Sequence, residues 1–273
     1  MDENNIISPE EGLKQNLTGR RVASITGIAV FCIFVIYYTI MSLLSPGRKI
    51  ASINEEFGFR TPENTVIDER IFSDSSFVMM NRDKAFYQAR ITMAETDSIS
   101  LSINMPDSLA ILEINGVTVH TAKITWMRLS KVFSKADEYA ISSMLSTPFT
   151  VSRDYASIKK EPLMLKIAPK DTTEYKPDIL PDTSNVEAVS YMLEMENGFR
   201  LYVYQADEEE SGNLSRFFFD LADRFRNSID ITGSIFRFKV PEYHPAIRVK
   251  LPKADARIIY RGMPRQGQIA LYR

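Results

Sequence analysis

The chain is poor in the residues that most metal sites and nucleophilic sites use. Its 273 residues include one cysteine, Cys32, and two histidines, His120 and His244. A zinc site would need both histidines together with carboxylates, and their spacing fits no familiar ligand pattern. Cys32 lies between Phe31 and Ile33, where apolar surroundings keep a thiol protonated and unreactive. We therefore expect no metal, no cofactor and no cysteine nucleophile.

Charge is missing from one long segment. The 23 residues from Val22 to Leu44 carry no charged side chain and are mostly apolar. As a helix this segment would be about 34 Å long, which exceeds a hydrocarbon core of about 30 Å. The apolar core of a signal peptide is shorter, about 7–15 residues, and it is followed by small residues at the cleavage site. Here the bulky Leu43 and Leu44 stand in that place, so the segment is predicted to be a transmembrane helix.

The basic residues beside this span do not set its orientation by themselves. Each flank carries three of them: Lys14, Arg20 and Arg21 before the span, and Arg48, Lys49 and Arg60 after it. A short tail before one uncleaved span is the usual arrangement of a signal anchor. Residues 45–273 contain no cysteine, which suits an oxidising compartment. We expect a single-pass protein of the inner or plasma membrane with a cytoplasmic N-terminus and an extracytoplasmic, periplasmic bulk.

Composition and periodicity divide the chain into six expected parts. In chain order they are a cytoplasmic tail (1–21), the transmembrane helix (22–44), a stalk or linker (45–75), a first α+β lobe (76–168), a Pro- and Asp-rich linker (169–185) and a second α+β lobe with a basic C-terminus (186–273). The predicted fold class is α+β, with two small β-rich lobes after the span. Both lobes contain an alternating strand, a proline, polar residues, an apolar run and a glycine, so a duplication is also expected.

Short alternating segments predict the strands. Two hairpins are expected around Asn115-Gly116 and Asn197-Gly198, because Asn-Gly supplies the two positive-φ positions of a type I′ turn. Further strands are predicted at "SISLSINMP", "EPLMLKIAP", "IFRFKV", "PAIRVKL" and "QIALYR". Helices are predicted at residues 126–146, 213–228 and 253–262.

The predicted helix at 213–228 is amphipathic. Its apolar residues follow i, i+4, i+7, i+11 spacing, and charged residues face away from them. The apolar stripe consists of Leu214, Phe218, Leu221 and Phe225, and the charged side of Arg216, Asp220, Asp223 and Arg224.

One short motif matches a known catalytic pattern. Ser157 and Lys160 have the Ser-x-x-Lys spacing of penicillin-binding and β-lactamase-like acyl transferases, in which the lysine follows the nucleophile by one helical turn. The companion Ser-Asp-Asn and Lys-Thr-Gly elements are missing, and Glu161-Pro162 would break the helix that aligns the pair. Ser157 and Lys160 are therefore weak catalytic candidates.

The C-terminal segment resembles part of another family. Residues 246–272, "AIRVKLPKADARIIYRGMPRQGQIALY", resemble the segment of L,D-transpeptidase domains in which Cys-Ile-Arg-Leu precedes Asp-Ala, Leu-Tyr and Pro-x-Gly. Ala246 stands where that cysteine would be, the Asp255-Ala256 pair is displaced by two residues, and the upstream His-Gly is absent. The resemblance implies a catalytically dead homologue with a binding or scaffolding role.

Charge is distributed unevenly along the chain. Residues 171–223 carry 13 acidic and 3 basic side chains, whereas residues 236–273 carry 9 basic and 2 acidic ones. The predicted helix 253–262 places three basic residues four apart on one face, and the preceding strand adds two alternating ones. This candidate patch for an anionic partner comprises Arg248, Lys250, Lys253, Arg257 and Arg261. Its partner would be an anionic polymer, lipid headgroups or an acidic protein face, or the acidic segment 171–223 of the same chain.

These features favour a non-enzymatic role. We expect a single-pass membrane protein that acts as an interaction or scaffolding component of a cell-envelope assembly, such as a secretion, division or wall-building machine. Its partners would be other envelope proteins. Nucleic acid is excluded by the compartment and by the lack of aromatic residues among the basic ones. The alternatives are an enzyme that modifies cell wall or glycan, the dead L,D-transpeptidase-like domain, and a transmembrane signalling protein.

Overall fold

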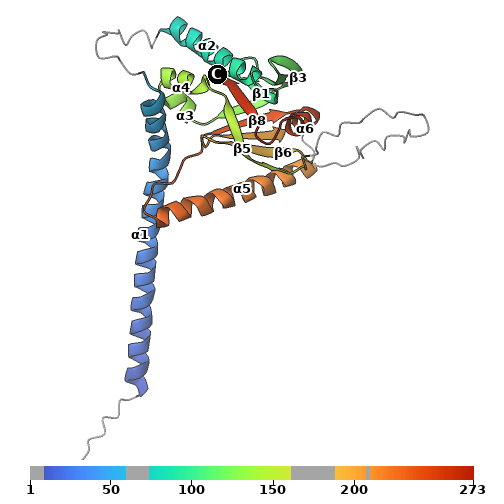
Figure 1. Ribbon diagram of the computed structural model, residues 1–273. Coiled ribbons are helices and arrows are strands. Elements are labelled where there is room, and N and C mark those ends of the chain that lie inside the picture. Colours follow the sequence, from blue (N-terminus) through green and yellow to red (C-terminus); the bar gives the residue numbers. More distant parts are fainter. Residues whose placement is uncertain (1–8, 60–73, 161–187, 207–209) are drawn as a thin grey trace, which may run out of the picture. The chain divides into compact units, whose positions relative to one another are not determined.

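The computed structural model describes residues 9–59, 74–160, 188–206 and 210–273 (Figure 1). It is an α+β fold, with six helices and one nine-stranded sheet among these residues. The helices are α1 Pro9–Phe57, α2 Ser75–Ala94, α3 Val132–Lys135, α4 Glu138–Leu145, α5 Glu210–Phe236 and α6 Lys253–Gly262. The strands are β1 Ile99–Asn104, β2 Leu109–Ile114, β3 Val117–Lys123, β4 Trp126–Leu129, β5 Phe149–Ala156, β6 Ser190–Met195, β7 Arg200–Gln205, β8 Ala246–Leu251 and β9 Gln268–Tyr272.

The chain forms two compact units. The first consists of Met1–Gly47 with Ile229–Glu242, and the second of Arg48–Ser228 with Tyr243–Arg273. Helices α1 and α5 each have residues in both units.

Helix α1 contains the expected transmembrane segment. Within Ser24–Phe57 it is long and apolar enough to cross a membrane, and no other helix of the described chain is. Its apolar side chains, among them Ile25, Ile28 and Ile33, are exposed rather than packed in a core. The hydroxyls of Thr26 and Thr39 each donate to the carbonyl four residues earlier, so these polar groups need no partner outside the helix.

The helix does not end where the span was expected to end. It passes through Pro46 and continues to Phe57, so residues 45–57 of the expected stalk are helical. Ile50, Ile53 and Phe57 recur at helical spacing and pack into the core of the second unit, with Ile53 buried. Packing of this stripe stabilises helical turns that Pro46 alone would disfavour. The remainder of the expected stalk, 60–73, lies outside the described residues.

The sheet joins both halves of the chain. Its strand order is β3-β2-β1-β9-β5-β6-β7-β8-β4. Strand β9, from the C-terminal end, pairs parallel with β1 and antiparallel with β5. Strand β4, from the first half, pairs antiparallel with β8. A strand from each half of the chain therefore pairs with a strand of the other half. The expected division into two lobes and the expected duplication are not confirmed.

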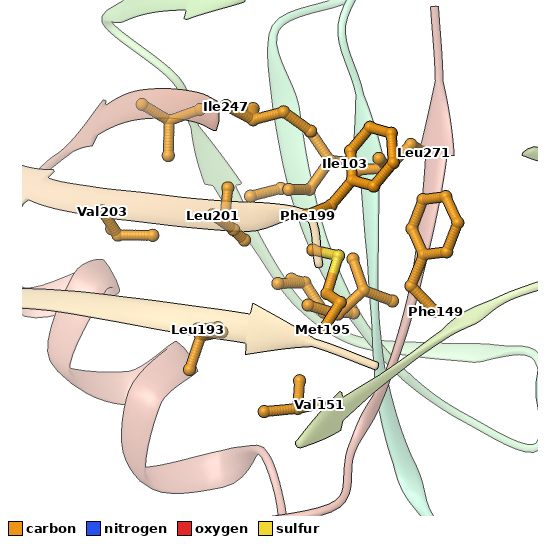
Figure 2. Close-up of a cluster of buried hydrophobic side chains, with 14 of the residues drawn as sticks. Ile103, Phe149, Val151, Leu193, Met195, Phe199, Leu201, Val203, Ile247 and Leu271 are labelled. Carbon is orange, nitrogen blue, oxygen red and sulfur yellow. The ribbon is translucent and has the colours of Figure 1, made fainter. Parts of the chain in front are cut away.

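One hydrophobic core serves both halves. Figure 2 shows Ile103 of β1, Leu193 of β6, Leu201 of β7, Ile247 of β8 and Leu271 of β9 gathered in one cluster. All five are almost inaccessible to solvent. The expected boundary at 169–185 lies outside the described residues, so the linker expected there stays a prediction.

Helices cover both faces of the sheet. The main core lies on one face and includes buried side chains of α3, α4 and α6, among them Phe133, Ile141 and Ile259. On the other face, the buried side of α2 packs against Ala270 and Tyr272 of β9. A second small cluster on that face consists of Met192, Tyr202 and Tyr204, with Phe219 of α5 packed against it.

Both predicted hairpins are confirmed, with different turns. Asn115 and Gly116 have φ of 49° and 77°, as a type I′ turn requires. In the second hairpin only Gly198 has a positive φ, of 80°, and the N–H of Gly198 donates to the carbonyl of Met195. Two residues join the first pair of strands, whereas the longer loop 196–199, with the left-handed Gly198 inside it, joins the second.

Several predicted elements need correction. The helix expected at 126–146 begins instead with strand β4, because Trp126–Leu129 alternates and pairs with β8, and only α3 and α4 follow. "IFRFKV" (235–240) is not a strand: α5 continues to Phe236, and Phe238, with φ of 56°, follows its last turn. Helix α2 and strand β5 were not predicted, and "EPLMLKIAP" lies outside the described residues.

Candidate functional site

The structure separates the five residues of the predicted basic patch. Arg248 and Lys250 are in register with Tyr202 and Tyr204 of β7, and the Arg248 guanidinium lies 5.0 Å from the centroid of the Tyr202 ring. They therefore face α5. Their neighbours Ile247, Val249 and Leu251 point into the main core on the other face.

The remaining three residues of the patch lie on α6, which covers that other face. Its Ala256, Ile259 and Tyr260 are buried in the main core, and Lys253, Arg257 and Arg261 are half-buried at its sides. Arg248 and Lys250 are consequently on the opposite side of the sheet from the α6 residues. Binding of an anionic partner by these residues stays a prediction.

The weak catalytic candidates Ser157 and Lys160 have other partners. The Ser157 hydroxyl donates to the carbonyl of Ala188 and accepts from the N–H of Ser190, which ties the end of β5 to the start of β6. The Lys160 ammonium lies 3.7 Å from the Asp154 carboxylate and 4.9 Å from the centroid of the Tyr260 ring. Burial lowers the pKa of the Lys160 ammonium, and Asp154 partly offsets this. Residues 157–160 are not helical, so the one-turn geometry of the Ser-x-x-Lys motif is not formed.

The two histidines are part of hydrogen-bonded contacts within the sheet domain. His120 Nε2 lies 3.1 Å from Asp255 Oδ1, which connects β3 with α6. His244 Nδ1 lies 2.9 Å from the carbonyl oxygen of Gly198 at the second hairpin. Within the described ranges, no group of three or more His, Cys, Asp or Glu side chains is placed to hold a metal ion.

Helix α5 packs on the sheet through its charged side. The hydroxyl of Tyr202 donates to Asp223 and that of Tyr204 to Asp220, both at 2.8 Å. The Arg216 guanidinium lies 4.4 Å from the centroid of the Tyr204 ring. Burial raises the pKa of both tyrosine hydroxyls, and the neighbouring aspartates raise it further. The polar side of α5 is thus held against a tyrosine-lined surface.

A buried ion pair lies beneath the same helix. Arg200 Nε and Nη2 both donate to Oε1 of Glu194, its cross-strand neighbour, at 3.1 and 2.9 Å. Nη1 of Arg200 reaches Asn227 of α5 at 3.4 Å. Burial alone would lower the pKa of the guanidinium, but the hydrogen bond and charge of Glu194 outweigh it and raise that pKa. This pair stabilises the contact between the sheet and α5.

Helix α2 has an apolar side that no other described element covers. Its Ala85, Phe86, Ala89 and Met93 are buried against the sheet. On the opposite side Met80, Tyr87 and Ile91 recur at spacings of seven and four, with exposed fractions of 68%, 58% and 61%. The exposed Lys84 completes this stripe. We call Met80, Lys84, Tyr87 and Ile91 the α2 face.

Sequence reasoning missed the α2 face for a physical reason. Because α2 has apolar residues on both sides, its sequence lacks the amphipathic period by which helices are recognised. The missed signal was the Asp74 side chain before the helix, which caps the N–H groups of Ser76 and Phe77.

Comparisons with protein-family models, with curated proteins and with solved structures gave no match.

Proposed function

We propose that this protein is a single-pass, membrane-anchored interaction component of a cell-envelope assembly, with a cytoplasmic N-terminus and the sheet domain outside the cytoplasm. Helix α1 supports the anchoring part of the proposal, because most of the apolar side chains in its uncharged segment are exposed. The last turns of the same helix belong to the core of the domain.

The α2 face is the observation that supports the second part of the proposal, which is binding to a partner protein. Three large apolar side chains at helical spacing are exposed on a helix whose opposite side is already buried. Methionine and tyrosine are enriched in the cores of protein interfaces, and this spacing is the one that helical recognition uses. The partner we propose is therefore an apolar surface of another envelope protein.

Site-specific photo-crosslinking in intact cells tests this proposal. A photoreactive side chain at Tyr87 or at Ile91 should give the same adduct, because both positions lie on one face. The same side chain at Lys135, an exposed residue outside α2, is the matched control and should not give that adduct. Met80→Glu should remove the adduct formed from Ile91, since a carboxylate in the contact would be desolvated.

Two results would contradict the proposal. Identical adducts from Lys135 and from the α2 face would mean that the capture is not specific. An adduct from Ile91 that survives Met80→Glu would mean that the α2 face does not form the contact.

The basic residues of α6 permit a separate test of an anionic partner. Replacing Lys253, Arg257 and Arg261 by glutamate reverses the charge at three half-buried positions without changing the α2 face. A set of crosslinked partners that does not change would show that these residues are ordinary surface charge.

A further inference from the structure

Helix α5 turns its apolar side away from the sheet. A helix on a folded domain normally turns such a stripe toward the core. Here four apolar side chains at helical spacing are exposed, with fractions of 63%, 58%, 50% and 68%. We call these residues the α5 stripe: Leu214, Phe218, Leu221 and Phe225. All of them belong to the second compact unit, whose part of this helix ends at Ser228.

Contacts within the same unit fix this orientation. Asp220 and Asp223 accept hydrogen bonds from tyrosines of β7. The Arg226 guanidinium lies 3.9 Å from the centroid of the Tyr155 ring of β5. Rolling the helix to bury the α5 stripe would break these contacts and leave the tyrosine hydroxyls without their acceptors. The stripe is therefore held in place as an exposed apolar surface, which is a mark of an interaction site.

The spacing of the α5 stripe is that of a short coiled-coil seam. Its four residues follow one another at intervals of four, three and four, which are the d, a, d and a positions of a heptad. Side chains at these positions pack between those of a facing helix. The partner that fits the stripe is therefore a helix with apolar residues at the same spacing.

A second copy of α5 in the antiparallel direction is such a helix. With a two-fold axis between residues 219 and 220, each residue before the axis lies opposite the residue equally far after it. Phe218 then lies opposite Leu221 of the second copy, and Leu214 opposite Phe225 of the second copy. Every layer of the seam joins one leucine to one phenylalanine, so its volume is even along its length, as close packing requires.

The residues beside the seam are also complementary to themselves. In the same register Phe217 and Arg224 lie opposite each other, once on either side of the axis, and both are exposed. A guanidinium over a phenylalanine ring is a favourable cation–π contact. On the other flank the small residues Ser215 and Ala222 lie opposite each other and permit a close approach. The only carboxylates of residues 214–228 accept hydrogen bonds from the sheet, so none opposes the pairing.

The exposed area approaches what a stable dimer needs. A phenylalanine has about 150–250 Å² to bury, so the α5 stripe and Phe217, which is 60% exposed, together present roughly 500 Å² per copy. A standard interface buries about 800 Å² per partner. The apolar residues alone thus supply more than half of such an interface. Because α5 is already held on the sheet, pairing does not have to order the helix first.

We propose that the protein forms a two-fold symmetric dimer in which two α5 helices pack antiparallel through their α5 stripes. The same surface of both copies meets across the axis, so the contact closes on itself and does not extend into a filament. The dimer uses none of the residues of the α2 face. This inference and the proposed function can therefore fail independently.

Disulfide trapping tests the register of the pair. The full chain with Cys32→Ser is purified in detergent, and Leu214→Cys is combined with Phe225→Cys. Oxidation should give a covalent dimer, because each thiol lies opposite the other position of the second copy. Either substitution alone should give none, because the two copies of one residue lie about 16 Å apart along the seam, whereas a disulfide requires Cα atoms within about 7 Å.

The matched control is the pair Tyr87→Cys with Ile91→Cys on the α2 face, which should not give a covalent dimer. Three results would overturn the inference. The first is a dimer from either single variant as abundant as that from the double variant, since parallel pairing or random collision would produce it. The second is the absence of a dimer from the double variant, and the third is equal crosslinking of the control pair.

Light scattering tests the dimer without oxidation. The mass of the Cys32→Ser chain in detergent should rise from one copy to two as the protein concentration increases. Leu221→Glu should raise the dissociation constant at least about tenfold, because two carboxylates would be desolvated near the axis. Leu221 is 50% exposed in a single copy, so the domain should still fold.

Ile91→Glu is the matched substitution on the α2 face and should leave the dissociation constant unchanged. A chain that stays monomeric at every concentration would overturn the inference. Equal effects of Leu221→Glu and Ile91→Glu would overturn it as well, because the dimer would then not depend on the α5 stripe.

Discussion

The buried pair of Arg200 and Glu194 offers the sharpest test of how the sheet and α5 hold together. The side chains of these two residues are only 9% and 14% exposed, and two guanidinium nitrogens donate to one carboxylate oxygen. In Glu194→Ala the guanidinium would lose its carboxylate partner and keep the long contact to Asn227, at 3.4 Å, and an interaction with the Tyr202 hydroxyl. Removing one partner of a buried pair costs about 3–5 kcal/mol.

The slight exposure of both side chains places the expected loss at the lower end of that range. A loss of about 3 kcal/mol lowers the melting temperature of a domain of roughly 200 residues by about 6–12 °C. The double variant Glu194→Met with Arg200→Met removes both charges and keeps side-chain volume. It should be within about 1 kcal/mol of the wild type, because apolar replacement of a buried pair is often neutral.

The assay is denaturant unfolding of the full chain in detergent, followed by fluorescence. Trp126 is the only tryptophan, and it lies on β4 in the same sheet, so its signal reports unfolding of the domain. The reasoning is refuted if Glu194→Ala costs less than about 1 kcal/mol, or if the double variant is as unstable as the single one.

Three further predictions use the same assay. Phe199→Ala should cost about 3–5 kcal/mol, because Phe199 is 1% exposed and stacks on Phe149 at 5.6 Å; a loss near zero would mean that this core is not packed as described. Ile53→Ala should cost about 2–4 kcal/mol and Met79→Ala less than about 0.5 kcal/mol, since Ile53 is 3% and Met79 61% exposed; equal effects would exclude the end of α1 from the core. The free energy of unfolding should fall as pH rises above about 10, the pKa of an unfolded tyrosine. The reason is that burial raises the pKa of four tyrosine hydroxyls in the folded domain, those of Tyr191, Tyr202, Tyr204 and Tyr260. A stability that does not change with pH in this range would contradict the burial of these hydroxyls.

Local patterns predicted the elements whose neighbours are close in sequence. The alternation around Asn115-Gly116 predicted a hairpin, and the absence of charge between Val22 and Leu44 predicted a helix that could span a membrane. Each of these signals depends only on side chains and turn geometry within one segment.

Features that depend on distant partners could not be read in this way. Trp126–Leu129 is a strand because it pairs with β8, which lies more than 100 residues later in the chain. The local sequence of either segment does not indicate this pairing. The outward direction of the apolar side of α5 could not be predicted either, because it depends on Tyr202 and Tyr204 donating hydrogen bonds to aspartates on the charged side of the helix. A helical period shows that a helix has two sides but not which side is buried.

The anchoring and orientation of the chain are tested most directly by labelling a single cysteine in intact cells. In the Cys32→Ser chain, Lys135→Cys places a thiol at an exposed position of the sheet domain outside the α2 face. A membrane-impermeant maleimide should label it without lysis, and the labelled chain should stay in the membrane fraction after an alkaline wash. Labelling only after lysis would contradict the orientation, and a labelled chain released by the wash would contradict the anchor.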